Sequence, residues 1–287
     1  YCAHFMKKFI PGLLLLFFVQ SIEAQVCNRS QLPTNLQNGL VAYYPFCGNA
    51  NDVSGNGRNG QINGQASFTN DRFGNTQSAV SLPDVDDNIT VNSASSLGLT
   101  NQVSISLWFK KDQIFGISSH YLFRNGQFFS NGFLIGLDGN DGAYGSSNNL
   151  LFFQVANGQA ARFIISKSEL LKWTHVVGTY DGNIVRLFVN SVQVASSTFT
   201  GQINSPNSSL VMADWDNPTG PDAPDRKIDD VFLFNRALQA CEVSQLYKAT
   251  ATGVPALGSL SLNPFSDTTS VCGKTANLDA GAGYNSY

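Results

Sequence analysis

The chain has 287 residues, a length that fits one large β domain or two ordinary domains. Hydrophobic residues make up 43% of the sequence, which supplies a core and excludes an intrinsically disordered chain. Charged residues make up only 13% and leave a net charge of −3, which excludes the basic surfaces that bind nucleic acid or anionic lipid.

The N-terminal stretch has the layout of a secretory signal peptide. Lys7 and Lys8 precede an apolar run over 9–19, and Ala24 supplies a small residue after it. These are the three parts of such a signal, and the run is too short to span a bilayer. We therefore expect residues 1–24, upstream residues and signal together, to be removed. The product is expected to be secreted or at the cell surface, with no membrane insertion.

Export changes how the cysteines are interpreted, because disulfides form in an oxidising compartment. The spacing of cysteine and histidine matches no zinc motif. Cys27 is predicted to pair with Cys47, which closes a short loop, or with Cys241, which ties the lead-in to the end of the domain. The sequence does not choose between them. Cys272 lies in a separate C-terminal segment, and we expect its partner elsewhere.

Short apolar runs alternate with turn clusters from Gly39 onward, which is typical of β-strands. The predicted strands cover 40–46, 103–109, 150–155, 173–180, 184–189, 192–195 and 228–234. A turn over 181–183 joins two of them into a hairpin, and a short helix is predicted over 238–248. Many short strands with one terminal helix favour an all-β protein made of two packed antiparallel sheets.

Residues 37–248 resemble the laminin-G-like, concanavalin A-like jelly-roll domains of secreted bacterial proteins. Four stretches carry the resemblance: GLVAYYPF with the loop after it (39–57), VSISLWFK (103–110), WTHVVGTYDG (173–182) and IDDVFLFNRAL (228–238). The resemblance implies a two-sheet antiparallel jelly-roll sandwich with a short C-terminal helix.

The segments that flank this domain are read from composition and from a second resemblance. Residues 25–36 are a lead-in, and 249–269 are small and Gly/Pro-containing, which indicates a linker. Residues 270–287 resemble the start of an immunoglobulin-like repeat of large secreted proteins from Bacteroidetes-type bacteria. We expect the sequence to be a fragment of a longer secreted protein.

The resemblance leaves the choice between enzyme and binding module open, because this fold hosts both glucanases and lectin-like binders. Glucanases of this architecture carry a Glu-x-Asp-x-x-Glu type strand. The mature chain has only Glu169 and Glu242, and neither has an acidic neighbour two residues on. No serine elbow, P-loop or HExxH motif is present. We predict no catalytic residues, and we interpret His175 as a structural histidine.

A loop tryptophan is the main candidate for ligand contact. Trp215 stands between Asp214 and Asp216, where an aromatic face can stack on a sugar ring beside hydrogen-bonding carboxylates. The alternative is a tryptophan folded onto the sandwich, and the sequence does not decide. The predicted partner is extracellular carbohydrate or a surface protein.

Calcium is the predicted cofactor, since turn-borne Asp and Asn oxygens are the ligands that this ion prefers. One candidate cluster combines Asn49, Asn51, Asp52 and Asn56 after the first strand with Asp229 on the closing strand. We expect the first and last strands to be neighbours, so that loop and strand share an ion. The resemblance to a structural calcium in jelly-roll glucanases implies a role for Asp229.

A second candidate calcium cluster lies further along the chain. Asp86, Asp87 and Asn88 precede a strand, and Asp214 and Asp216 follow one. These positions resemble the two ligand-bearing segments of pentraxins. Both clusters have a simpler interpretation, because Asp and Asn fill β-turns for conformational reasons alone.

The sequence thus predicts a secreted, non-catalytic binding or adhesion module that recognises carbohydrate or a surface partner with calcium support. Two alternatives remain open. The chain is a glucanase-like glycoside hydrolase in the first, and a passive spacer in a multidomain adhesin in the second.

Overall fold

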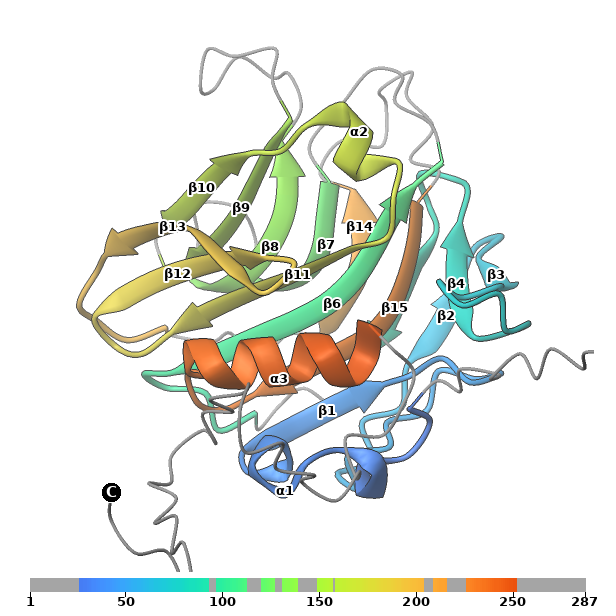
Figure 1. Cartoon of the computed structure of the whole chain (residues 1–287), viewed down its shortest axis with the longest axis horizontal. Coiled ribbons are helices and arrows are strands. Elements are labelled where there is room, and N and C mark those ends of the chain that lie inside the picture. The colour runs from blue at the N-terminus through green and yellow to red at the C-terminus, as the bar shows by residue number, and fades with distance from the viewer. Residues whose placement is uncertain are drawn as a thin grey trace, which may run out of the picture.

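Two antiparallel sheets pack face to face, with helices on the outer side of one of them (Figure 1). A computed structural model describes residues 26–92, 97–112, 120–126, 131–138, 149–156, 158–203, 209–215 and 226–251. Within these ranges the all-β jelly-roll prediction is confirmed.

The larger sheet has eight strands among the described residues. Its order is β13 (Val192–Thr198), β12 (Ile184–Val189), β11 (Thr174–Tyr180), β6 (Val103–Lys111), β15 (Arg226–Phe234), β4 (Ala79–Leu82) and β3 (Ser67–Thr69), with β1 (Leu40–Tyr44) also paired to β15. We call it sheet A.

The second sheet, sheet B, has seven strands in the same part of the chain. Its order is β10 (Gln159–Ile164), β9 (Leu150–Val155), β8 (Gly132–Asp138), β7 (His120–Gly126), β14 (Leu210–Trp215), β5 (Asn88–Val91) and β2 (Gln61–Asn63). The described helices are a 3-10 turn (Arg29–Gln31), α1 (Thr34–Gln37), α2 (Lys167–Leu170) and α3 (Ala240–Ala251).

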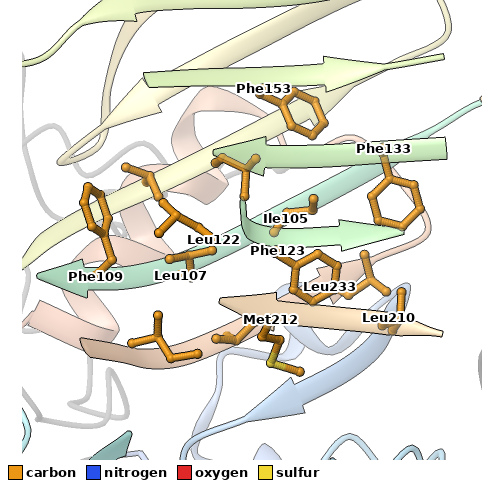
Figure 2. Packing of buried hydrophobic residues seen from close by; sticks show 14 of the residues in the cluster. Ile105, Leu107, Phe109, Leu122, Phe123, Phe133, Phe153, Leu210, Met212 and Leu233 are labelled. Carbon is orange, nitrogen blue, oxygen red and sulfur yellow. The ribbon is translucent and has the colours of Figure 1, made fainter. Parts of the chain in front are cut away.

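The main core lies between the sheets and follows from the alternation of side chains along each strand. On β6, Ile105 and Leu107 point into this space with no exposed surface. Figure 2 shows Phe123, Phe133 and Phe153 of sheet B on the other side of the same space. Burying each such side chain contributes about 1.5–3 kcal/mol, so this layer holds the two sheets together.

The outer face of sheet A carries a second buried cluster. Val177 and Phe188 of sheet A belong to it, together with Val243 and Leu246 of α3. In Figure 1, α3 lies across this sheet. The helix begins at Ala240 rather than at residue 238, and its apolar side covers the outer surface of the sheet.

The first and last strands are neighbours, as the sequence predicted. β1 runs antiparallel to β15, with Leu40 opposite Phe234 and Tyr44 opposite Val231. β1 ends two residues earlier than predicted. The physical reason is Pro45, which has no N–H for the ladder, followed by Phe46 at a φ of +53°.

A disulfide joins the lead-in to the end of β1. Cys27 bonds Cys47 across a separation of 20 residues, which decides between the two pairings that the sequence left open. Next to it, Val26 and Leu32 are buried in the outer cluster of sheet A. The bond therefore holds the lead-in against the domain.

Several predicted features fall outside the described residues. These are the signal peptide (1–24), nearly all of the linker (249–269), the immunoglobulin-like start (270–287) and Asp216. None of the helices in the described ranges is long and apolar enough to cross a membrane.

Removing the Cys27–Cys47 bond is expected to destabilise the domain. Closing a loop of this length stabilises the folded state by about 3 kcal/mol, because it restricts the unfolded chain. The C27S/C47S variant should lose about that much unfolding free energy and unfold at a lower urea concentration. Urea titration followed by tryptophan fluorescence measures it. An unchanged urea midpoint would contradict a stabilising role for this disulfide.

Candidate functional site

The outer face of sheet B carries an ion pair between neighbouring strands. Arg124 of β7 donates through Nε to the Oδ2 of Asp214 on β14 at 2.5 Å, and a second guanidinium nitrogen contacts the same oxygen. The side chains are 23% and 18% exposed. A planar guanidinium beside a carboxylate offers donors and acceptors at fixed angles, which suits a polar ligand.

Apolar side chains adjoin this pair on the same face. Tyr121 lies opposite Asp214 in the strand register, and the Arg124 guanidinium is 5.9 Å from the centre of the Tyr121 ring. Tyr121 packs with Leu134 and Phe152 in a cluster separate from the main core. These three side chains are buried, so the partly exposed ion pair is what makes this face the candidate binding site.

The structure describes two of the three residues that the sequence predicted to contact a ligand. Asp214 is on this face, and the backbone of Trp215 pairs with His120 at the end of β14. Asp216 lies outside the described residues. Sequence reasoning missed Arg124, because it stands 90 residues before Asp214 and only strand pairing brings them together.

A buried arginine crosses the sandwich just behind this face. Arg226 begins β15 in sheet A and is 1% exposed. Its Nη2 donates to the carbonyl of Asp87 at 2.9 Å and also to the carbonyl of Ala213, which precedes Asp214. Burial lowers the pKa of Arg226 to about 10. The side chain ties the two sheets together and fixes the backbone beneath Asp214.

Asp87, whose carbonyl accepts from Arg226, also uses both of its carboxylate oxygens in hydrogen bonds within the protein. It is fully buried, its Oδ1 accepts the N–H of Gln65 at 2.5 Å, and its Oδ2 accepts the N–H of Asp84 at 2.7 Å. Gly64, at a φ of +76°, allows this approach, because a Cβ there would collide with the carboxylate.

The neighbours of Asp87 are also engaged. Asn88 accepts the side-chain N–H of Asn63 at 2.9 Å and donates to the carbonyl of Asp86 at 3.2 Å. These contacts are those of a turn and a cross-strand pair.

The first predicted calcium cluster is likewise tied into local turns. Asp52 is 9% exposed, and its Oδ1 accepts the N–H of Tyr43 at 3.1 Å and of Ser54 at 2.8 Å. Its Oδ2 accepts the N–H of Arg58 at 3.0 Å. Asp52 therefore fastens the loop after β1 back onto that strand.

The three asparagines of this cluster also make local hydrogen bonds. Asn49 accepts the N–H of Asn51 at 2.9 Å through its side-chain oxygen. Asn56 donates to the carbonyl of Leu40 at 3.1 Å and to that of Val41 at 3.0 Å. The side chains of Asn49 and Asn56 therefore shape the loop, and Asn51 contributes its backbone N–H.

Asp229 contacts a cation that the protein itself supplies. Arg72, in the loop between β3 and β4, pairs through Nη1 with Asp229 and through Nη2 with Asp230 at 2.5 Å. Its Nε donates to the carbonyl of Thr250, near the end of α3, at 2.8 Å. The guanidinium also lies 4.6 Å from the ring centre of Trp108.

A β-bulge explains why two successive aspartates face one arginine. Neighbouring residues of a strand normally point to opposite faces. Here the strand register shifts after Asp229, and the next residue, Asp230, has a φ of +46°. Both carboxylates are fully buried. Burial, together with the adjacent Asp230, raises the pKa of Asp229, although Arg72 opposes this.

The surroundings of Asp52 and Asp229 do not fit a shared calcium ion. The Asp229 carboxylate contacts Arg72, whose positive charge would repel a divalent cation, and both oxygens of Asp52 accept backbone N–H groups. Among the described residues, no group of three or more His, Cys, Asp or Glu is placed to hold a metal. Calcium binding stays a prediction that these contacts do not favour.

His175 has the surroundings of a structural histidine. It lies under α3, its Nε2 is 2.8 Å from Ser106 Oγ, and its ring packs against those of Trp108 and Tyr247. Burial lowers the pKa of His175 to about 3, so the ring is neutral in the folded protein. A second buried histidine, His120 on β7, behaves in the same way. Burial, together with the nearby charge of Lys111, lowers the pKa of His120 to about 2.

Comparison with protein families gives one match. The family model described as the concanavalin A-like lectin/glucanases superfamily matches residues 83–244. That span includes the strands of both sheets that carry Arg124, Asp214 and Asp229. No curated protein sequence matches the chain.

Three solved structures illustrate the shared fold. Domain 4 of AbnA, an extracellular arabinanase from Geobacillus stearothermophilus solved in complex with arabinotriose, is 22% identical with a TM-score of 0.55, over 72% of this chain and 98% of that one. The binding domain of Paraclostridial mosquitocidal protein 1 is 19% identical with a TM-score of 0.58, over 75% of this chain and 53% of that one. The botulinum neurotoxin serotype G binding domain is 19% identical with a TM-score of 0.60, over 74% and 51%.

The chain therefore spans about half the length of the toxin domains and nearly all of the arabinanase domain. At these identities the likeness shows a shared fold. The three neighbours differ in source, and two of them are described as binding domains.

Removing the Arg72 side-chain charge is expected to destabilise the protein strongly. The R72M variant keeps an apolar stem of similar length but leaves two buried carboxylates unpaired, so we expect a loss of about 3–5 kcal/mol. The control is K172M, which removes the exposed pair with Glu169 and should cost under about 1 kcal/mol. Urea unfolding measures both.

Adding D229N/D230N to R72M should recover much of that loss, because neutral side chains need no counter-charge. Equal stabilities of R72M and K172M would contradict the assignment of this buried ion pair.

Acid is expected to destabilise the fold through His175. Its pKa in the folded protein, about 3, lies below that of the unfolded chain, so below about pH 6.5 the unfolded state gains the proton first and stability falls. From about pH 6 to about pH 5 the wild type should lose about 1 kcal/mol more than H175Q, whose side chain does not titrate. Parallel pH profiles of unfolding free energy for the two proteins would refute a neutral buried imidazole.

Proposed function

The chain belongs to the concanavalin A-like lectin/glucanases superfamily, and on that basis we propose that it is a non-catalytic module that binds extracellular carbohydrate. The observation that carries the proposal is the outer face of sheet B. There the Arg124–Asp214 pair stands beside Tyr121. Fixed, partly exposed polar groups of this kind can hydrogen-bond sugar hydroxyls, and the buried rings of Tyr121 and its neighbours hold the pair in place.

The neighbours support a binding role. The arabinanase domain of the same fold is described in complex with arabinotriose, and this chain covers nearly all of it. The toxin neighbours are described as binding or receptor-binding domains. Carbohydrate is the partner that we favour, because the Arg124–Asp214 pair is partly exposed and its two charges compensate each other.

The described carboxylates support the non-catalytic part of the proposal. Glycosidases need two accessible carboxyl groups on either side of the scissile bond. Glu169 is paired with Lys172, and Glu242 with Arg236. The adjacent pair on β15, Asp229 with its neighbour, is fully buried under α3 against Arg72, so a saccharide cannot reach it.

Secretion is also part of the proposal. The Cys27–Cys47 disulfide fits an oxidising compartment. It agrees with the signal-like layout of residues 1–24 in the sequence. Calcium is left out, because the carboxylates of Asp52, Asp87, Asp214 and Asp229 already contact backbone N–H groups or arginine.

A glycan array probed with the purified chain tests the proposal. We expect retention on a subset of saccharides, and a loss of at least about tenfold in affinity for the R124A/D214A variant, which removes two or more hydrogen-bonding groups. The matched control is K172A, at an exposed lysine that follows α2, which should bind like wild type. The bound saccharides should also stay uncleaved in a reducing-sugar assay.

Three results separate the alternatives. A blank array with a stably folded chain favours the spacer. Release of reducing sugar favours the glucanase. Calcium support would appear as a melting temperature that rises with added calcium and falls with chelator.

A further inference from the structure

A small polar pocket opens on the outer face of sheet A, on the other side of the molecule from the candidate face. It has a volume of about 160 Å³ and lies where α3 begins, beside β12 and β13. We infer that this pocket is a second binding site, which takes one neutral sugar residue. This inference rests on the proposed carbohydrate-binding function and adds a location and a ligand class to it.

The strands and the helix start explain why a hollow forms there. Phe188 of β12 and Leu238, which precedes α3, line the pocket. Both are buried and belong to the apolar cluster on the outer face of sheet A. Ala237 and Ala240 also line the pocket, and their side chains are too short to fill it. The helix therefore covers Phe188 but leaves a space beside it.

Two carboxamides line the pocket from different elements. Gln193 lies on β13, directly opposite Phe188 in the strand register, and Gln239 precedes the first residue of α3. Both residues are exposed, and neither side chain has a hydrogen-bond partner among the described residues. Each carboxamide has an NH₂ group that donates hydrogen bonds and an oxygen that accepts them. A sugar hydroxyl, which both donates and accepts, can bind to either.

An ion pair supplies the remaining polar groups. Arg186 Nη1 lies 2.6 Å from Asp181 Oδ2, with side chains 27% and 29% exposed. The other oxygen of Asp181 accepts the N–H of Asn183 at 2.9 Å and of Ile184 at 2.8 Å, so the hairpin turn fixes the carboxylate. The pair presents a rigid edge whose charges cancel.

The size and charge of the pocket define the ligand class. Sites for drug-sized molecules span roughly 300–1,000 Å³, so a pocket of about 160 Å³ takes a single ring. Two neutral amides and one compensated ion pair favour an uncharged ligand with several hydroxyl groups. A neutral residue of a glycan chain, with the rest of the chain extending into solvent, fits both conditions.

Isothermal titration of the full chain with neutral probes tests this inference. The probes are arabinotriose, maltotriose and any neutral saccharide retained on the array, with a trimer of galacturonic acid as the charged comparison. We expect a neutral probe to bind at two sites per chain, and the affinity of one of them to fall about tenfold in Q193A/Q239A, the loss expected for two hydrogen bonds. A single exposed glutamine outside the pocket, Gln159 on β10, gives the matched control Q159A.

A bulky variant keeps the test independent of the amides. A240W should fill the pocket and weaken the neutral probe by at least about tenfold, and circular dichroism verifies its fold. Unchanged affinity of both variants, with loss in R124A/D214A, would overturn the pocket and leave the proposed function standing. Binding of the acidic trimer alone would overturn it as well. A wild-type chain that binds no saccharide would overturn both proposals.

Discussion

The contact of Arg72 with two buried aspartates joins segments of the molecule that lie far apart in the sequence. One guanidinium links the loop between β3 and β4 to Asp229 and Asp230 of β15 and to the carbonyl of Thr250 in α3. β15 pairs with three strands of sheet A, namely β6, β4 and β1. A defect at this point would loosen the closing strand and its covering helix together.

The two outer faces of the sandwich are used differently. On sheet A, α3 and the disulfide-held lead-in cover apolar side chains such as Phe188 and Phe232, and a small pocket lies at the helix start. On sheet B, a partly exposed ion pair between β7 and β14 stands beside Tyr121. Arg226 connects the two layers behind that pair, so the backbone under Asp214 is fixed by the core. A rigid scaffold of this kind can hold polar groups in place for a ligand.

Local patterns in the sequence indicated an all-β protein, and the family resemblance supplied the jelly-roll topology. Alternating residues on β6 identified the inner face, since Ile105 and Leu107 repeat with the period of a strand. The Asp181-Gly182 turn marked the hairpin of β11 and β12. The adjacency of β1 and β15 came from the resemblance, and the register confirms it.

The site was less predictable, because its contacts join residues distant in the chain. Nothing local marks Arg72 as the partner of Asp229, 157 residues later, and the bulge that turns Asp230 to the same side depends on strand pairing. Composition suggested calcium because Asp and Asn are abundant in the loops. The structure shows Asp52 and Asp87 using their oxygens to hold turns, a role with the same residue preferences.

A crystal structure of the chain with a saccharide retained on the array would test the binding account most directly. We predict an intact sugar on an outer face of the sandwich, either against Arg124 and Asp214 on sheet B or between Gln193 and Gln239 beside α3. A sugar bound away from both places would contradict the assigned sites. A hydrolysed product beside a pair of carboxylates would contradict the non-catalytic role.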